Sequence, residues 1–341
     1  MPPHSVNIAV NGYGRIGRCI VRALYELDYT RNTRLVAINA TTDIETVAYL
    51  TRHDSTHGKF AADVRVVDDQ HIAINDDIIQ VYCQRDPAKI PWGEVATEVL
   101  CECTGKFKSN ALAQPHLDNG ANKVLISAPA SGDVDATVVY GVNTDILKAE
   151  HCVVSNASCT TNCLAPVAKV LHDTIGIEHG LLTTVHAYTN DQVLIDSAHK
   201  ELRRARSATT SIIPTKTGAA QAVGLVLPQL AGKLHGYALR IPTLNVSLVD
   251  LTFTASRPTT KQEVNQVMQT AAQDSMAGII AYCDAPLVSC DFNGHTASAI
   301  YDSTLTQVME GNLVKVSAWY DNEWAYACRM IDTSHALMAA K

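Results

Sequence analysis

The chain has 341 residues, of which 47% are hydrophobic and 18% are charged, which is typical of globular domains and excludes a disordered or low-complexity chain. Its length favours two domains over one. The formal net charge of −7 argues against a general role in binding nucleic acid or a membrane surface, and no apolar run approaches the ~20 residues of a membrane-spanning helix. The ten cysteines show neither disulfide spacing nor zinc-ligand spacing, so we expect a reducing cytoplasm and no metal site.

The N-terminal part predicts a dinucleotide-binding unit. Residues 6–10 form a short apolar strand pattern, and residues 18–27 have the apolar spacing of a helix. Between them lies the sequence Asn11-Gly12-Tyr13-Gly14-Arg15-Ile16-Gly17, a G-x-G-x-x-G motif in the context that makes it informative. Its glycines allow a tight turn and let a pyrophosphate approach the N-terminus of the helix. The alternative is a glycine-rich turn without a ligand.

The next strand, residues 34–39, leaves the choice of coenzyme open. The dinucleotide fingerprint expects an acidic residue after this strand, to bind the ribose 2′-hydroxyl. This chain has Ala40 and Thr41 there, and Asp43 only further on. A missing carboxylate removes repulsion against a 2′-phosphate, although Asp43 or backbone groups could still hold an unphosphorylated ribose.

Further strand patterns cover residues 63–67, 78–82, 98–103 and 123–127, and helical patterns cover residues 44–49 and 110–119. Thr104 and Ser127 stand at the ends of two of these strands, where a doubly wound sheet binds its ligand. We therefore predict an α/β Rossmann dinucleotide-binding domain over residues 1–158.

A second feature is the cysteine in Ser155-Asn-Ala-Ser158-Cys159-Thr160-Thr-Asn-Cys163. An apolar run precedes this stretch and another follows it, which predicts a strand, a tight turn and a helix that begins at Cys159. The helix dipole and unpaired backbone N–H groups there favour a thiolate, and the hydroxyls of Ser158 and Thr160 offer donors to an oxyanion or a phosphate. A buried structural cysteine in a capped turn is the alternative.

The second half predicts an α+β catalytic domain, residues 159–321, with a mixed or antiparallel sheet, and a C-terminal helix within 322–341 that joins the first domain. Its patterns are strands at 180–189, 246–253, 298–300 and 314–319, a helix at 260–272, a terminal helix at 326–340 and an irregular segment at 190–213. Long irregular segments inside compact domains are usually functional.

Candidate partners for Cys159 lie in this half. His186, near a strand end, is a candidate base by the logic of cysteine–histidine pairs, although a single histidine is more often a surface or core residue. Arg206 and Arg240 are candidate anion anchors, with ordinary ion pairing as the alternative. Thr217 and Gly218 open a helix and are either a phosphate seat or a simple cap.

With these residues assembled, the chain closely resembles the phosphorylating glyceraldehyde-3-phosphate dehydrogenase family, bacterial type, over almost its whole length. The motifs that carry the resemblance are Asn11–Gly17, Ser155–Asn162, His186-Ala-Tyr-Thr-Asn-Asp191, Leu202-Arg-Arg-Ala-Arg206, Thr217-Gly-Ala-Ala220 and Trp319-Tyr-Asp-Asn-Glu-Trp324. The resemblance implies a homotetramer in which Cys159 attacks glyceraldehyde 3-phosphate and His186 acts as the base. A thioester formed by hydride transfer to NAD or NADP is then attacked by inorganic phosphate, which releases 1,3-bisphosphoglycerate.

The resemblance also implies roles for individual residues. Those similar to coenzyme contacts are Gly12, Gly14, Arg15, Ile16, Gly17, Arg85, Thr104, Ser127 and, at the nicotinamide carboxamide, Asn322. Thr189 and Arg240 resemble the site for the substrate phosphate. Ser158, Thr160, Thr217 and Gly218 resemble the site for inorganic phosphate, with Arg206 between the two sites. Cys163 has no assigned role.

Two departures from the family pattern bear on the coenzyme. Strictly NAD-dependent members carry an acidic residue in place of Ala40 and Leu-Pro in place of Ser197-Ala198, so we expect NADP use alongside or in preference to NAD. The related erythrose-4-phosphate dehydrogenase is an alternative, with some similarity at residues 241–246, whereas residues 188–191 are of the phosphorylating type. A non-catalytic binding protein, for RNA as an example, is disfavoured by the acidic charge and the complete set of Cys, His and Arg.

Overall fold

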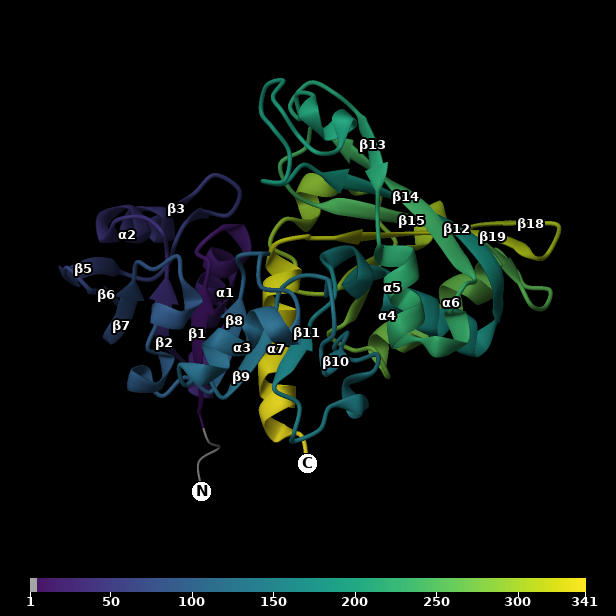
Figure 1. Cartoon of the computed structure of the whole chain (residues 1–341). Coiled ribbons are helices and arrows are strands. Elements are labelled where there is room, and N and C mark those ends of the chain that lie inside the picture. The colour runs from purple at the N-terminus through teal and green to yellow at the C-terminus, as the bar shows by residue number, and fades with distance from the viewer. Residues whose placement is uncertain (1–4) are drawn as a thin grey trace. The chain divides into compact units, whose positions relative to one another are not determined.

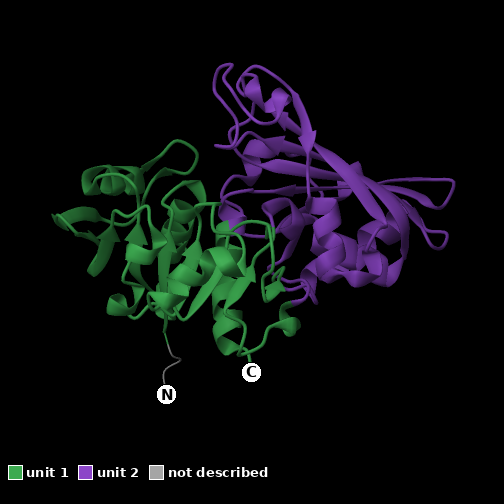
Figure 2. Ribbon diagram, viewed as in Figure 1, with its two compact units in different colours: residues 1–140, 144–157, 327–341 green, residues 141–143, 158–326 purple. Residues whose placement is uncertain are grey.

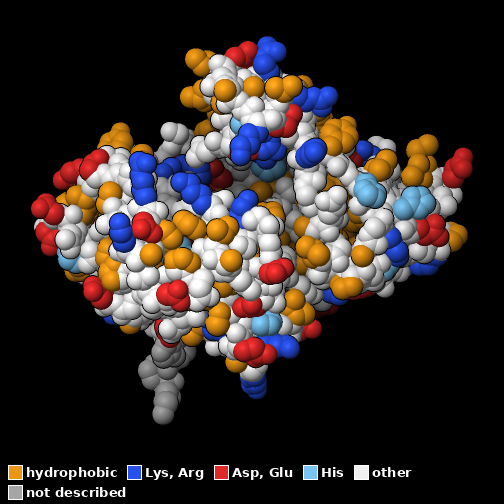
Figure 3. Space-filling view, in the orientation of Figure 1, with side chains coloured by type: hydrophobic (Ala, Val, Ile, Leu, Met, Phe, Trp, Pro, Cys, Tyr) orange, Lys and Arg blue, Asp and Glu red, His pale blue; other side chains and the backbone are white. Residues whose placement is uncertain are grey.

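The computed structural model describes residues 5–341 and divides them into two compact units (Figure 2). Unit 1 contains the described residues up to 140, residues 144–157 and residues 327–341. Unit 2 contains residues 141–143 and 158–326. Acidic and basic side chains are both distributed over the face of each unit that Figure 3 presents. Among the described residues, no helix is long and apolar enough to cross a membrane.

Unit 1 is built on a nine-stranded sheet in the order β10-β11-β9-β8-β1-β2-β7-β6-β5 (Figure 1). The strands are β1 (Val6–Asn11), β2 (Thr33–Asn39), β5 (Val64–Asp68), β6 (His71–Ile74), β7 (Asp77–Tyr82), β8 (Val99–Glu102), β9 (Lys123–Ile126), β10 (Ala136–Thr137) and β11 (Val153–Ser155). From β10 to β7 all neighbours are parallel, whereas β6 pairs antiparallel with both β7 and β5. This is the predicted Rossmann arrangement with an antiparallel edge.

The remaining elements of unit 1 are α1 (Arg15–Glu26), α2 (Ile44–Arg52), α3 (Asn110–Asp118) and the hairpin strands β3 (His53–Asp54) and β4 (Gly58–Lys59). The C-terminal helix α7 (Trp324–Ala339) contributes its residues from 327 onward to this unit. It is tied to unit 1 by hydrogen bonds from Tyr29 Oη to Asp332 Oδ1 (3.2 Å) and between Thr33 Oγ1 and His335 Nε2 (2.7 Å). The parallel strands are apolar on both faces, as a sheet covered by helices requires.

Unit 2 is built on an eight-stranded mixed sheet in the order β13-β14-β12-β15-β19-β17-β16, with β18 also paired to β19. Its strands are β12 (Ile177–Ala187), β13 (Ile213–Lys216), β14 (Leu234–Ile241), β15 (Ser247–Ala255), β16 (Ile280–Cys283), β17 (Ala299–Asp302), β18 (Gln307–Met309) and β19 (Leu313–Tyr320). Its helices α4 (Cys159–Thr174), α5 (Ala219–Val226) and α6 (Lys261–Gln273) lie along one face of the sheet (Figure 1). The predicted mixed sheet is confirmed.

The strand β14 has no counterpart in the sequence-based prediction, yet it lies next to the strand that carries His186. Gly236 and Arg240 interrupt its apolar pattern. A Cβ atom at Gly236 would lie 2.1 Å from the carbonyl oxygen of Leu182, so the close approach of β12 and β14 requires glycine there. The parallel register of these two strands pairs His186 with Arg240, which determines the composition of the site described next.

Candidate active site

Cys159 is the first residue of α4, as the sequence predicts. The strand β11 ends at Ser155, and Ala157 takes the left-handed conformation (φ 54°) that turns the chain toward the helix. Ser158 is the N-cap, and its Oγ accepts a hydrogen bond from the backbone N–H of Thr161 (3.1 Å). The thiol therefore lies beside the unpaired N–H groups at the N-terminus of a 16-residue helix.

His186 is the partner of this thiol. Its Nε2 atom lies 3.6 Å from Cys159 Sγ. Its Nδ1 atom lies 2.6 Å from the carbonyl oxygen of Ala187 and 2.9 Å from Arg240 Nη1. We assign the hydrogen to Nδ1 on the shorter of these contacts, because a carbonyl oxygen can only accept. The Nη1 group of Arg240 donates to the same carbonyl oxygen at 3.0 Å. The hydrogen on Nδ1 leaves the lone pair of Nε2 directed at the thiol, which is the tautomer that a base toward Cys159 needs.

The pKa of the Cys159 thiol is shifted in the opposite direction from the one expected for a thiolate. Burial raises the pKa of the Cys159 thiol, and it outweighs the opposing effects of Arg240 and of the Thr160 backbone N–H. Burial also lowers the pKa of His186 to about 3, helped by the charge of Arg240 and opposed by the Ala187 carbonyl. The helix terminus alone therefore does not lower the pKa of this thiol as expected, because desolvation is the larger effect. Both pKa shifts favour the uncharged thiol and the uncharged imidazole.

Arg240 presents a cationic group next to the Cys–His pair. Its Nη1 atom lies 3.4 Å from Thr189 Oγ1, in addition to its bond with Ala187. Its Nε–H is buried and has no hydrogen-bond partner among the described residues. An unsatisfied buried donor on a guanidinium fits an anionic ligand that supplies the missing acceptor. Arg240 and Thr189 are thus brought together, as expected for a phosphate site.

Tyr320, which sequence reasoning passed over, completes the surroundings of His186. Its hydroxyl lies 2.8 Å from Thr160 Oγ1 and 2.9 Å from Thr184 Oγ1, and burial raises its pKa. The edge-on ring contact with His186 has a centroid distance of 5.9 Å and an interplanar angle of 78°. Since Thr160 Oγ1 already has this buried partner, any bond from Thr160 to a phosphate must share or displace it. The Trp319–Trp324 motif was the signal that could have drawn attention to Tyr320.

The glycine motif of unit 1 has the geometry of a dinucleotide loop. Gly12 has φ 95°, and a Cβ atom there would lie 2.7 Å from the backbone nitrogen of Thr104. A Cβ atom at Gly17 would lie 2.3 Å from the carbonyl oxygen of Gly12, whereas one at Gly14 would meet nothing within 4 Å. The first and last glycines are needed for packing, and the middle one leaves open space at the N-terminus of α1, where a pyrophosphate can approach.

Comparison with known proteins agrees with both units. Residues 6–110 match the family model described as the NAD binding domain of glyceraldehyde 3-phosphate dehydrogenase, and residues 158–322 match its C-terminal domain. The chain belongs to the glyceraldehyde-3-phosphate dehydrogenase family. The resemblance found in the sequence is therefore confirmed, and so are the predicted fold class and the nicotinamide coenzyme.

Individual relatives cover almost the full chain. A plasmid-encoded glyceraldehyde-3-phosphate dehydrogenase of Cupriavidus necator is 56% identical over 99% of this chain and 100% of its own length. Glyceraldehyde-3-phosphate dehydrogenases of Pseudomonas aeruginosa and Priestia megaterium are 53% and 51% identical, over 99% and 98% of this chain and 99% of each relative.

In the irregular segment of this family member, Arg206 and Arg204 have different partners. Arg206 is exposed, and its Nε donates to Asp196 Oδ2 (2.7 Å). Arg204 instead donates from Nε to Thr215 Oγ1 (2.9 Å) and pairs with Asp191. Burial is the largest cause of the lowered pKa values of His186 and Arg240, and the positive charge of Arg204 adds to both shifts. Arg204 is therefore the guanidinium of this motif whose field reaches the catalytic groups.

The sequence offered two interpretations of the helix start at Gly218, a phosphate site and a simple cap. Gly218 is the N-cap of α5, and Thr217 Oγ1 accepts from the backbone N–H of Ala219 (3.2 Å). Thr217 therefore caps the helix with its oxygen while its hydroxyl proton remains available to an anion. Thr215 lies in β13, and its hydroxyl donates to Glu201 Oε2 (3.0 Å).

The expected coenzyme contacts in unit 1 lie around the carboxyl ends of its strands. Arg15 pairs with Asp54 (Nη2 to Oδ1, 2.9 Å); burial acts to raise the pKa of that carboxyl, but Arg15 and two backbone N–H groups hold it well below its usual range. Ile16, Thr104 and Ser127 are half-buried, and Arg85 is exposed. Thr104 donates its backbone N–H to Glu102 Oε1 (2.7 Å).

The first two residues after β2 are Ala40 and Thr41, so no carboxylate follows this strand directly. Ala40 is buried, and its N–H donates to the carbonyl oxygen of Tyr82 (2.9 Å), while Thr41 is exposed. Asp43 is the N-cap of α2 and accepts from the backbone N–H and the hydroxyl of Thr46 (both 2.8 Å). The carboxylate nearest in sequence is thus occupied in capping a helix.

Two further expected contacts belong to unit 2. Asn322 is buried, and its Oδ1 accepts a hydrogen bond from Ser247 Oγ (2.8 Å), so its Nδ2 is the polar group available to a ligand. Ser197 is exposed in the irregular segment, where its backbone N–H donates to the carbonyl oxygen of Ala205 (3.0 Å).

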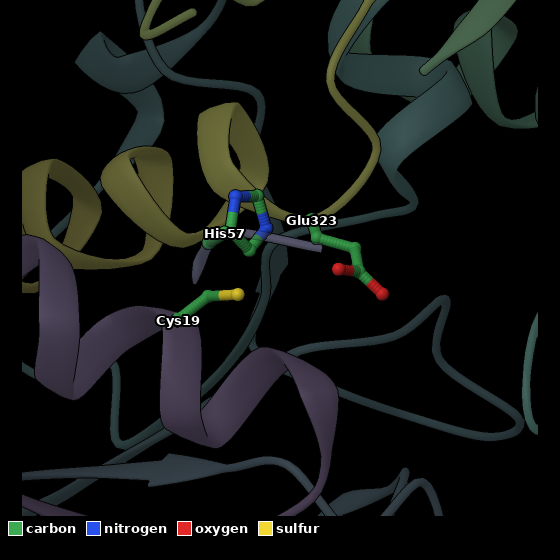
Figure 4. A group of neighbouring side chains, drawn as sticks. All are labelled: Cys19, His57 and Glu323. Atoms are coloured by element: carbon green, nitrogen blue, oxygen red, sulfur yellow. The ribbon is translucent and has the colours of Figure 1, made fainter. Parts of the chain in front are cut away.

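Figure 4 shows Cys19, His57 and Glu323, side chains of types that bind metal ions. Cys19 lies on α1 and His57 in the β3–β4 hairpin, both in unit 1, whereas Glu323 belongs to unit 2. Unit 1 thus offers two ligands here, fewer than the four of structural zinc sites. We assign no metal to this group.

Proposed function

We propose that this chain catalyses the oxidation and phosphorylation of glyceraldehyde 3-phosphate to 1,3-bisphosphoglycerate with NAD or NADP. The observation that carries the proposal is the pairing of Cys159 Sγ with His186 Nε2, 3.6 Å apart at the start of α4. Its support is membership of the family and the cationic Arg240 beside the pair. Nothing in the relatives' names favours the erythrose-4-phosphate alternative.

The first step forms a carbon–sulfur bond. Sγ attacks the aldehyde carbon while its proton passes to His186 Nε2, which is free to accept it because the Ala187 carbonyl holds the hydrogen of the ring on Nδ1. The aldehyde oxygen gains negative charge and lies near the N–H groups at the start of α4, which stabilise it. The protonated imidazole then returns the proton to this oxygen, so that the product is a hemithioacetal and His186 is neutral again.

The second step needs a hydride acceptor and a base. A nicotinamide coenzyme held by the glycine loop would supply the acceptor for the hydride of the hemithioacetal carbon. His186 takes the hydroxyl proton of the hemithioacetal, so that a thioester on Cys159 results. Inorganic phosphate then attacks the thioester carbonyl, the C–S bond breaks, and the protonated imidazole returns its proton to the departing sulfur. The acyl phosphate retains the free energy of the oxidation.

The proposal includes two phosphate-binding sites next to the Cys159–His186 pair. Thr189 and Arg240 bind the phosphate of the substrate, which satisfies the unpartnered Nε–H of Arg240. Thr217, Gly218, Ser158 and Thr160 bind the attacking phosphate. We assign to Arg204 the role that the sequence suggested for Arg206, because the charge of Arg204 acts on His186 and Arg240.

In this proposal Asn322 orients the carboxamide of the nicotinamide. The proposed coenzyme contacts in unit 1 are Gly12, Gly14, Arg15, Ile16, Gly17, Arg85, Thr104 and Ser127. Ala40 and Thr41, together with Ser197 and Ala198, admit a 2′-phosphate, which supports use of NADP as well as NAD. We also propose two domains, a dinucleotide-binding domain of residues 1–158 with 322–341 and a catalytic domain of residues 159–321. The proposal includes a homotetramer and a cytoplasmic location. Exposed Leu181 and Tyr237, on neighbouring strands β12 and β14, are apolar surface available to a second copy.

The test is turnover of the purified full chain. With glyceraldehyde 3-phosphate, inorganic phosphate and NAD or NADP, we expect reduced coenzyme and acyl phosphate to form in equal amounts. Omitting phosphate should limit the reaction to one equivalent per chain, and Cys159→Ser should abolish it. Phosphate-independent turnover of erythrose 4-phosphate, with glyceraldehyde 3-phosphate left unused, would overturn the proposal.

A further inference from the structure

Unit 1 contains a buried carboxylate that the reaction does not use. Glu102, the last residue of β8, has no exposed surface, and neither has His116 of α3, which contacts it. A buried carboxylate is costly unless donors surround it, so the identity of its donors indicates its role.

Each oxygen of Glu102 accepts hydrogen bonds from a different part of unit 1. Oε1 accepts from the backbone N–H of Thr104 (2.7 Å) and from its hydroxyl. Oε2 accepts from Asn11 Nδ2 (2.5 Å) and lies 3.4 Å from His116 Nε2. Because Trp92 Nε1–H donates to His116 Nδ1 (3.1 Å), the hydrogen of the imidazole is on Nε2, which lies 3.4 Å both from the carboxylate and from Asn11 Nδ2.

The bonds continue across the carboxyl ends of the parallel strands. Asn39 Nδ2, at the end of β2, donates to Asn11 Oδ1 (2.7 Å), and Asn39 Oδ1 accepts from the backbone N–H of Gln84 (2.9 Å). Donors and acceptors therefore alternate from Gln84 through Asn39 and Asn11 to Glu102. The carboxylate is the terminal acceptor of a chain that lies at the edge where a doubly wound sheet binds its ligand.

The two groups that Glu102 joins flank the glycine loop. Asn11 precedes Gly12 directly, and Thr104 is the residue against which Gly12 packs so closely that a Cβ atom would clash at 2.7 Å. We propose that Glu102 is a positioning residue for coenzyme binding, whose carboxylate holds the glycine loop and the Thr104 turn at the separation that the pyrophosphate requires. This inference rests on the coenzyme site of the proposed function.

The variant Glu102→Gln tests the donor requirement. Both carboxylate oxygens accept their hydrogen bonds from N–H or O–H donors. In either orientation of a glutamine side chain, its NH2 group therefore faces a donor, and that donor loses its acceptor. We expect the Kd for NAD and for ADP-ribose to rise about tenfold, because a lost buried bond of this kind is worth about that factor. The kcat at saturating coenzyme and the KM for glyceraldehyde 3-phosphate should stay within about twofold of the wild type, as for an interaction made equally in ground and transition states.

Glu98→Gln is the matched control. Glu98 precedes the same strand, and its Oε2 accepts from the backbone N–H of Asn7 (2.7 Å), at the opposite end of the β1–β8 pair from the glycine loop. Both variants lose a carboxylate that bridges two strands, so we expect both to lower Tm. Only Glu102→Gln should weaken coenzyme binding. Glu102→Asp, which keeps the charge but shortens the reach, should give an intermediate Kd and serves if Glu102→Gln does not fold.

Isothermal titration of NAD, NADP and ADP-ribose into the full chain measures these affinities without turnover. Unchanged Kd values in the Glu102 variants, or an equal rise in Glu98→Gln, would overturn the inference. A wild-type chain that binds coenzyme but does not oxidise glyceraldehyde 3-phosphate would overturn the proposed function and leave this test intact. A wild type that binds neither NAD nor NADP would overturn both.

Discussion

His186 and Arg240 stand opposite each other on the parallel strands β12 and β14, so that the imidazole and the guanidinium share the carbonyl oxygen of Ala187. This pairing keeps a positive charge next to a histidine that must stay neutral. A neutral imidazole can accept a proton from Cys159, whereas a protonated one cannot. The neighbour that suits an anionic substrate therefore also keeps the base in its working form.

The pH dependence of stability should report on His186. Its folded pKa of about 3 lies below the unfolded value, so the unfolded chain binds the extra proton first and stability is lost as the pH falls below about 6.5. Between pH 6.5 and pH 5 we expect this residue to cost about 2 kcal/mol of unfolding free energy. Urea unfolding of wild type and His186→Asn at both pH values measures the difference. An equal loss in both proteins would contradict the assigned pKa.

The assignment of Arg204 in place of Arg206 predicts opposite outcomes for two neighbouring variants. Arg204→Ala should lower kcat/KM for glyceraldehyde 3-phosphate by about tenfold or more, because a cation that acts on the catalytic pair is lost. Arg206→Ala removes an exposed pair with Asp196 and should change it less than about threefold. Steady-state kinetics at fixed coenzyme decides between them, and the reverse ranking would restore Arg206.

Sequence reasoning reached Cys159, the glycine loop and the helix starts because their patterns are local. It named Arg206 and not Arg204, because the two lie close together in a segment without regular periodicity. It overlooked β14 because Gly236 and Arg240 break its apolar alternation, and hence it could not place Arg240 beside His186. The raised pKa of Cys159 is likewise a product of tertiary burial that the helix start alone does not reveal. The role of Glu102 could not be predicted either, because its burial and its hydrogen bond with Asn11 depend on the pairing of β1 with β8.

The coenzyme preference should follow the charge at position 40. Ala40→Asp places a carboxylate at the end of β2 and should lower kcat/KM with NADP by about tenfold relative to NAD, through repulsion of the 2′-phosphate. Ala40→Asn has nearly the same size without the charge and is the control. Kinetics with each coenzyme at low and high salt measures the effect. An equal loss with both coenzymes, or the same ratio in the Asn variant, would count against the electrostatic account.

Tyr320→Phe should show whether the Tyr320 hydroxyl affects the binding of inorganic phosphate in addition to the stability of the fold. It removes a buried hydroxyl that bonds to both Thr160 and Thr184, and leaves the ring that packs against His186. We expect a loss of about 1–3 kcal/mol of stability. The KM for inorganic phosphate should change more than that for the aldehyde, since Thr160 loses its partner. A phosphate KM identical to that of the wild type would remove Thr160 from the phosphate seat.

The central claim is that His186 Nε2 accepts the proton of Cys159 during attack on the aldehyde. Its most direct test is the rate of the first-turnover burst of reduced coenzyme in the absence of phosphate. His186→Asn should slow this burst by about 10²–10⁴-fold, the range of a lost general base, while the control His179→Asn, on the exposed part of the same strand, should not change it. A burst in His186→Asn within about threefold of the wild-type rate would contradict the account.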